Sequence, residues 1–239
     1  GILFLSLFFG ISKANAEEYT GQAIWPAEKI ANIFIRKYRA DGYIKYQQGS
    51  FIRRSEDNAF VYCLQPFVDI NNNYVYQVAR SDYEVYLNMS KEQFKKISLY
   101  AYYGYGYKDE KYNHTSKKWY GITQVLIWRT IRPDITWTFK TGRYGGIKAS
   151  LHFNEVSELL TLVYNHSILP SFDSEELNLF VGDKITLEDT NNVLYKFNIK
   201  STNNIKVIKK DNKLEITALE KTKEKLILEK QEVSNDFYL

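Results

Sequence analysis

Two side chains in this sequence stand out for the chemistry they could do, a lone thiol and a carboxamide. Cys63 is the only cysteine among the 239 residues and lies in the apolar and aromatic run Val61-Tyr62-Cys63-Leu64. A single cysteine cannot close an intrachain disulfide, so its thiol is either a small buried hydrophobic group or a nucleophile kept for chemistry. Gln124 lies in the segment Trp119 to Arg129, whose side chains would be apolar on almost every face if the segment formed a helix. An unpaired buried amide would cost about 1–3 kcal/mol, so Gln124 is either a hydrogen-bonded core amide or a reactive group.

A predicted strand and a predicted helix position these two side chains. Residues 59–64 have the aromatic and β-branched content of a strand, which places Cys63 in mid-strand. The segment from about Thr123 to Ile131 is predicted to be a buried helix that ends before Pro133. Gln124 then falls in the first helical turn, beside free backbone N–H groups and the positive end of the helix dipole.

Along the chain, the spacing of apolar residues changes twice, from strand-like to helix-like and back to strand-like. Early strands are predicted at 19–24 and 74–78. One helix is predicted after Ser90, where Ser90 and Gln93 form a capping-box pattern, and another from Asn154, which begins the clearest apolar helical stripe. From about residue 177 the period returns to two, which predicts strands with one solvated face. These strands are expected at 178–181, 184–188, 193–200, 205–209, 213–219 and, as an exposed last strand, after Lys221.

This order of strands, helices and strands predicts an α+β fold, namely a β-sandwich or barrel interrupted by an inserted helical subdomain. The single predicted domain spans residues 17–239. Its β portion comprises residues 17–87 plus 171–239, and its helical subdomain comprises residues 88–170. Two separate domains that meet near Pro170 are the alternative division.

The first residues have the pattern of an export signal. Gly1 to Ile11 is an apolar run too short to span a bilayer as a helix, and Ala14-Asn15-Ala16 follows as a small-x-small cleavage site. We therefore interpret residues 1–16 as the remnant of a secretory signal peptide, with the mature chain beginning at Glu17. The expected protein is secreted and does not insert into a membrane once the signal is removed.

Composition excludes several functional classes. The 32 basic and 28 acidic residues give a net charge of +4 and are interspersed, so no polybasic arm for nucleic acid is visible. One cysteine and three histidines leave little for a transition-metal cluster. We therefore expect no nucleic-acid partner, no metal and no cofactor.

Two short strings of the sequence resemble the motifs of a known family, the thioester domains of Gram-positive bacterial surface adhesins. These strings are Tyr62-Cys63 and Thr123-Gln124-Val125-Leu126-Ile127-Trp128. The resemblance implies that the Cys63 thiol and the Gln124 side chain form an internal thioester, within a β-sandwich that carries a helical subdomain. One departure concerns the pocket: the family usually has a small alanine two places after the glutamine, where this chain has Leu126.

The resemblance also implies a function. A thioester reacts with an amine, such as a lysine of a host surface or extracellular-matrix protein, to give an amide at Gln124 and a free Cys63 thiol. Nothing in this chemistry restores the bond, so each molecule would react once, as a self-catalysed cross-linker and covalent binder and not as an enzyme. The expected setting is a virulence-associated adhesin on the cell wall, anchored through a region absent from this chain.

Two other functional classes remain open at the level of sequence. A cysteine hydrolase or transglutaminase would need a histidine beside Cys63, whereas His114, His152 and His166 lie in loop or helix-end contexts. A non-covalent module that binds a host protein or a carbohydrate would use aromatic rings such as those of Tyr100 to Tyr107. Cys63 would then be a structural buried residue.

Overall fold

We describe the protein from a computed structural model, whose described residues are 20–24, 26–67, 75–77, 89–173, 175–200, 202–221, 223, 225–231, 233, 235 and 239. The predicted signal segment, residues 1–16, lies outside them. The chain divides into two compact units, the first made of residues 14–163 and 234–239 and the second of residues 164–233. Within the described residues, no helix combines the length and the apolar composition needed to cross a bilayer.

A three-stranded antiparallel sheet forms one side of the first unit. Its strands are β2 (Glu28–Arg39), β3 (Ile44–Phe51) and β5 (Ile135–Lys140), in the order β3-β2-β5. The hairpin between β2 and β3 turns at Asp41-Gly42, and Gly42 takes a positive φ of 88°, which glycine adopts without strain. β1 (Thr20–Gln22) pairs separately with β4 (Val75–Gln77).

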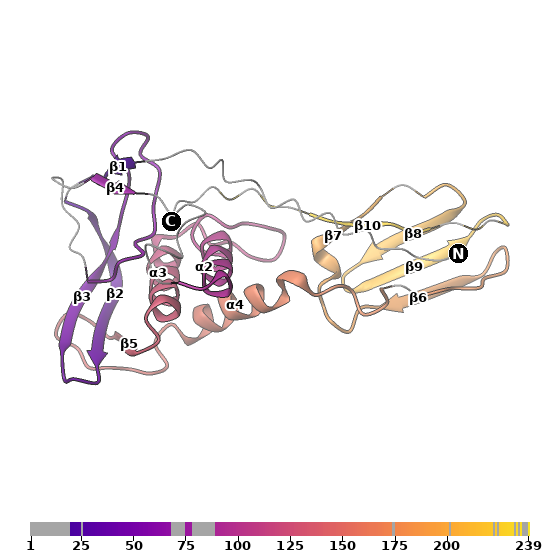
Figure 1. Ribbon diagram of the computed structural model, residues 1–239. Coiled ribbons are helices and arrows are strands. Elements are labelled where there is room, and N and C mark those ends of the chain that lie inside the picture. The colour runs from indigo at the N-terminus through magenta and orange to yellow at the C-terminus, as the bar shows by residue number, and fades with distance from the viewer. Residues whose placement is uncertain are drawn as a thin grey trace. The chain divides into compact units, whose positions relative to one another are not determined.

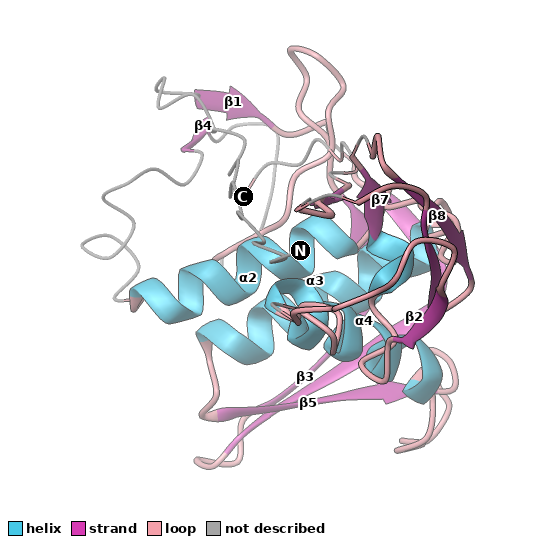
Figure 2. Cartoon of the chain, turned by 90° about the vertical axis from the view of Figure 1, so that its right-hand side faces the viewer, coloured by secondary structure: helices cyan, strands magenta, loops and turns pink. Residues whose placement is uncertain are grey.

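The described part of the first unit also contains three helices, which the figures show beside the sheet. They are α2 (Lys91–Tyr103), α3 (Lys117–Ile131) and α4 (Phe153–Tyr164). α3 contacts all three strands of the sheet, and α2 packs on α3 (Figure 1). Figure 2 shows the helices over the sheet from the side.

Helix α2 begins as its sequence predicts. The Ser90 side chain accepts from the Gln93 backbone N–H, and the Gln93 side chain accepts from the Ser90 N–H, which completes the predicted capping box. The Gln93 amide also donates to the Thr130 carbonyl at 2.9 Å and thereby joins α2 to the last turn of α3. The predicted capping box is confirmed.

Close packing of α3 on the sheet depends on two glycines that face Ile33. A Cβ atom on Gly121 of α3 would lie 2.9 Å from Ile33 Cγ2, and one on Gly49 of β3 would lie 2.7 Å from the same atom. Ile33 itself is fully buried. The missing side chains therefore let the helix approach the strands closely, which fixes the height of α3 over the sheet.

The second unit has its own sheets and its own core. β6 (Lys184–Glu188), β9 (Lys213–Ala218) and β8 (Ile205–Lys210) form an antiparallel sheet in that order, and β7 (Phe197–Ile199) pairs with β10 (Leu228–Lys230). Short 3₁₀ helices span Asn165–Ser167 and Leu194–Lys196. The buried core of this unit consists of Phe172, Val193, Leu194, Phe197, Leu214, Ile216, Leu226 and Leu228.

A buried carboxylate organises one loop of the second unit. Asp189 is fully buried, and its two oxygens accept backbone N–H groups from Ser171, Asn191, Val193 and Leu194 at 2.6–3.0 Å. Hydrogen bonds of this kind to a charged acceptor are among the stronger ones in proteins. Asp189 therefore ties the loop after β6 to the chain that enters the unit.

The α+β fold class is confirmed, but its predicted subdivision is wrong in two places. β5 lies inside the segment 88–170, which was expected to be helical, and it pairs with β2. Residues 171–239 were expected to complete the β portion of residues 17–87. Instead, the described strands from β6 onward pair among themselves around their own core, and none of the described sheets closes into a barrel. The alternative prediction, two domains that meet near Pro170, lies closer to the observed boundary, since the second unit begins at Tyr164.

Candidate functional site

Cys63 lies in an irregular segment and not in the predicted strand. Phe60 forms an isolated bridge with Arg53, and the chain at Tyr62 and Cys63 has no regular secondary structure. Helix α3 holds this segment instead: the Tyr120 hydroxyl donates to the Val61 carbonyl at 2.6 Å. The buried rings of Tyr62 and Tyr120 also stack, with centroids 4.8 Å apart and planes 11° from parallel. These contacts fix the backbone on the N-terminal side of the cysteine.

The Gln124 side chain lies against the backbone of Cys63. The Cys63 N–H donates to Gln124 Oε1 at 2.8 Å, and Gln124 Nε2 donates to the Cys63 carbonyl at 2.8 Å. Trp128, one turn later on α3, donates its Nε1 proton to the same carbonyl at 2.7 Å. The structure thus brings the two predicted site residues together across 61 positions of sequence.

The position of Gln124 in its helix differs from the prediction. Helix α3 begins at Lys117, so Gln124 lies in mid-helix and has no free helical N–H groups beside it. Gln124 is 4% exposed and is nevertheless satisfied, because the Cys63 peptide supplies both a donor and an acceptor. The N–H group at the carboxamide oxygen therefore comes from the Cys63 backbone.

The thiol of Cys63 is half-buried and donates to the Gln65 carbonyl at 3.3 Å. Burial raises the pKa of this thiol, since the thiolate is poorly solvated there. The positive charge of Lys37 and a hydrogen bond from Trp128 act in the opposite direction on the pKa. Activation of the thiol therefore depends on the charged and polar groups that counteract the rise in pKa caused by burial.

Lys37 is a buried cation that sequence reasoning missed. It is 1% exposed, and its Nζ donates to the Pro66 carbonyl at 2.6 Å. The ammonium also lies 4.9 Å, 5.1 Å and 5.3 Å from the ring centroids of Trp128, Trp137 and Phe67. A signal was present in the sequence, because Lys37 follows Ile33 and Ile35 at alternate positions and therefore takes the next inward place on β2.

A cavity of about 410 Å³ opens beside the cysteine and the glutamine. Cys63, Gln124, Tyr120 and Trp128 line one part of it. Residues of β2 and β3 line another, and among them are two lysines, Lys29 and Lys45, that sequence reasoning did not single out. The volume is within the range of small-molecule sites and leaves room for a side chain to reach the carboxamide.

Aromatic side chains cover part of the site. Tyr120 and Trp128 line the cavity, and Tyr62 packs behind the cysteine segment on Tyr120. Trp119, which neighbours Tyr120 in sequence, stacks on His114 with ring centroids 3.6 Å apart.

The histidines lie apart from the cavity lining. His114 is fully buried, with Nδ1 2.5 Å from the Tyr103 carbonyl and Nε2 2.6 Å from Glu158 Oε1. His152 Nε2 lies 3.2 Å from the Asn32 carbonyl, and His166 belongs to the second unit. None of the three histidines is among the described residues that line the cavity. In the described ranges, no three His, Cys, Asp or Glu side chains are grouped as a metal site would require.

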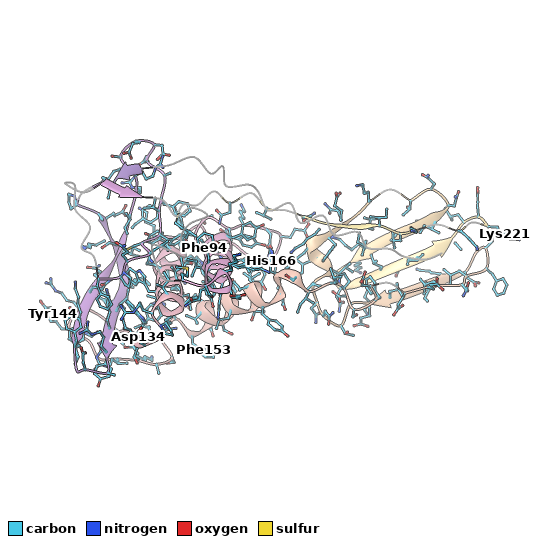
Figure 3. All side chains as sticks on the ribbon, in the orientation of Figure 1. Phe94, Asp134, Tyr144, Phe153, His166 and Lys221 are labelled. Carbon is cyan, nitrogen blue, oxygen red and sulfur yellow. The ribbon has the colours of Figure 1, made fainter. Side chains whose placement is uncertain are left out.

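The aromatic and glycine-rich stretch from Tyr100 to Tyr107 is largely part of the core. Tyr100, Tyr103 and Tyr107 are buried, and the last two pack edge to face with centroids 5.0 Å apart. Strongly exposed rings are found elsewhere, for example those of Tyr144 and Phe153 (Figure 3). The buried rings do not offer the ring surface that a non-covalent sugar or protein site would need.

Comparisons with known proteins agree with this geometry. Residues 60–165 match the family described as Thioester domain, and this range contains both Cys63 and Gln124. The solved thioester domain of the Staphylococcus aureus TIE protein is similar with a TM-score of 0.53 and 19% identity, over 84% of this chain and 78% of that chain. At that identity the likeness shows a shared fold. A search of curated protein sequences found no match. The part of the chain that carries both candidate site residues is therefore similar to the thioester domain family.

Proposed function

We propose that Cys63 and Gln124 condense to an internal thioester, through which the domain attaches covalently to an amine of a host surface protein. The observation that carries this proposal is the pair of hydrogen bonds, both 2.8 Å long, between the Gln124 carboxamide and the Cys63 peptide. They hold the carbonyl carbon of the glutamine beside the residue that carries the thiol. Proximity of this kind replaces a diffusional encounter.

Formation of the thioester needs a stabilised oxyanion and a leaving group. The Cys63 sulfur attacks the Gln124 carbonyl carbon, and the negative charge that develops on Oε1 is met by the Cys63 N–H that already donates to it. The Gln124 nitrogen, held by the Cys63 carbonyl, takes up the thiol proton and leaves as ammonia. One C–N bond breaks and one C–S bond forms, so atoms and charges balance.

The second step transfers the acyl group to an amine. A neutral primary amine attacks the thioester carbon, the C–S bond breaks, and the amine loses a proton to the departing Cys63 thiolate. The products are an amide at Gln124 and a free thiol. The lost ammonia is not replaced, so each molecule reacts once and the domain is a single-use binder.

We place this chemistry in a secreted adhesin on the surface of a Gram-positive bacterium. The family match, the bacterial structural neighbour and the signal-like segment of residues 1–16 support this setting. A covalent bond to a host protein would let the bearer withstand detachment without a large interface.

Intact-mass spectrometry tests the proposal directly. The purified chain should weigh about 17 Da less than its sequence, because one ammonia is lost, and methylamine should then add about 31 Da. Cys63→Ala and Gln124→Ala should each abolish both changes. Gln93→Ala is a matched control, since it removes a carboxamide of the same unit that bonds elsewhere.

Two results would contradict the proposal. One is a mass equal to that of the sequence together with full titration of the thiol in the folded protein. The other is a complex of wild type with its target that denaturant separates into its two components. That result would make the domain a non-covalent binder.

A further inference from the structure

The charged side chains that line the cavity, within the part of the chain that the structure describes, are of one sign. Among the described residues that line it, the charged side chains are Lys29 of β2 and Lys45 of β3. Both line the same cavity as Cys63 and Gln124. A third lysine, Lys37, is buried beside the cysteine segment, where its positive charge acts on the Cys63 thiol.

The register of the sheet makes this arrangement unusual. Lys37 of β2 is the direct cross-strand partner of Lys45 of β3. Directly opposed residues of an antiparallel pair project from the same face, and like charges placed there destabilise the sheet. The register therefore places a second lysine, Lys37, on the same face of the sheet as Lys45.

The hydrogen bond made by Lys29 leaves its ammonium at the cavity wall. Lys29 Nζ donates to the Ser50 hydroxyl at 2.9 Å, a neutral acceptor that does not cancel its charge. Ser50 is the cross-strand partner of Lys29 and also lines the cavity. Lys29 is exposed and Lys45 is half-buried.

We propose that this cavity selects a partner lysine that has aspartate or glutamate as its sequence neighbour. The inference rests on the thioester function proposed above and names its substrate class. Neighbouring carboxylates would pair with Lys29 and Lys45 while the amine enters toward Gln124. Amines with further positive charges, such as polyamines or lysines within basic sequences, would be repelled.

The same positive field assists the chemistry once the amine is inside. A nearby positive charge disfavours the protonated form of an amine, and only the neutral form attacks the thioester carbon. The lysines therefore have two effects that reinforce each other. They attract the carboxylates that flank the amine and keep the amine itself nucleophilic.

Three capped tripeptides with one reactive lysine each test this selectivity. Their sequences are acetyl-Glu-Lys-Glu-amide, acetyl-Gln-Lys-Gln-amide and acetyl-Arg-Lys-Arg-amide, and intact mass follows the rate of adduct formation. Two surface ion pairs of ordinary strength predict that the acidic peptide reacts about twofold to thirtyfold faster than the neutral one at low salt. The basic peptide should be slowest, and added salt should reduce the differences.

Variants assign the selectivity to the two lysines. Lys29→Gln with Lys45→Gln should bring the acidic-to-neutral rate ratio close to one, and Lys29→Glu with Lys45→Glu should invert it. Lys95→Gln with Lys148→Gln is the matched control, because it removes the same net charge from exposed lysines of the first unit. That control should keep the wild-type ratio.

The outcomes separate this inference from the proposed function. If wild type shows no 17 Da deficit and no methylamine adduct, the thioester function fails and this inference fails with it. If methylamine reacts but the acidic and neutral peptides react equally in wild type, the selectivity alone is refuted. A ratio that persists in Lys29→Gln with Lys45→Gln would also overturn it. The salt dependence in wild type gives the same decision should those variants fail to fold.

Discussion

Replacement of Trp128 by phenylalanine should destabilise the thioester form of the protein more than the amide form. The Cys63 carbonyl accepts two hydrogen bonds, from Gln124 Nε2 at 2.8 Å and from Trp128 Nε1 at 2.7 Å. Thioester formation releases the first donor as ammonia. Of these two donors only the indole N–H then remains, so Trp128→Phe leaves the carbonyl without either.

The size of the effect follows from this difference. With the amide intact, Trp128→Phe removes one of two hydrogen bonds, which costs about 0.5–1.5 kcal/mol. With the thioester formed, it leaves a half-buried acceptor without these partners, which costs about 1–3 kcal/mol. Lost stacking on Trp137 and the lost contact with Lys37 are common to both forms and cancel. The expected coupling is therefore about 1 kcal/mol.

A double-mutant cycle measures this coupling. Its four proteins are wild type, Trp128→Phe, Cys63→Ala and the double variant, because Cys63→Ala keeps the Gln124 amide intact. Thermal unfolding is followed by tryptophan fluorescence, and all four tryptophans lie before residue 164 and report on the first unit. The decrease in Tm on Trp128→Phe should be about 2–4 °C larger in the wild-type background.

Equal decreases in Tm in the two backgrounds would refute the reasoning. A coupling below about 0.3 kcal/mol is within the additivity found for independent sites. It would mean that the Cys63 carbonyl does not depend on Trp128 once the thioester has formed. Intact mass must confirm the 17 Da deficit in both proteins that keep Cys63.

Three further perturbations test other features of the structure. In the Gln124→Ala background, Lys37→Met should move the midpoint of thiol alkylation to higher pH, because the Lys37 charge lowers the pKa of Cys63 against the effect of burial; Lys95→Met is the control, and an unmoved midpoint contradicts the assignment. Asp189→Asn should destabilise residues 164–233 by about 2–4 kcal/mol, because its amide cannot accept all four N–H groups. Hydrogen exchange should show this loss, while the tryptophan-detected transition of the first unit should not move. Gly121→Ala should destabilise the first unit by about 1–3 kcal/mol, since the new Cβ meets Ile33 Cγ2 at 2.9 Å. In the Ile33→Ala background the same substitution should cost less stability, because the contacted atom is gone. Equal costs in the two backgrounds would argue against the close approach.

Sequence predicted the elements whose signals are local. The capping box at Ser90 and Gln93 and the end of α3 at Ile131 appear as expected, because each depends on residues within one or two helical turns. The strands β6, β8 and β9 follow their alternating pattern, with bounds within one residue of those predicted. Alternation in these strands survives because one face packs on the unit's own core and the other meets solvent.

Elements that depend on distant contacts were missed. β2 carries a bulge between Lys29 and Phe34, where Asn32 has a positive φ of 62°, and this irregularity breaks the period of two. The first turns of α3 contain aromatic residues and Gly121, which lower helix propensity. Gly121 is explained by the close approach of Ile33, which belongs to another element.

Part of the candidate site was recognisable from sequence and part was not. Cys63 and Gln124 stood out by residue type and motif, but the backbone groups that meet the carboxamide belong to the cysteine itself. No residue type encodes that arrangement. It follows from the position of Gln124 in mid-helix, opposite an irregular segment fixed by Tyr120 and Trp128.

The return of the chain to the first unit has a mechanical consequence for a covalently attached protein. Asn235 Nδ2 donates to the carbonyls of Tyr102 and Tyr105, at 2.6 Å and 3.2 Å, so the second unit is an excursion between residues 163 and 234 of the first. Consider a pull between an amide at Gln124 and a tether beyond Asn235. While the Asn235 contact holds, force passes through α3 and the end of α2, and the second unit is shielded. When that contact breaks, residues 164–233 enter the path of tension and can lengthen by unfolding, which would dissipate work while the bond at Gln124 stays intact.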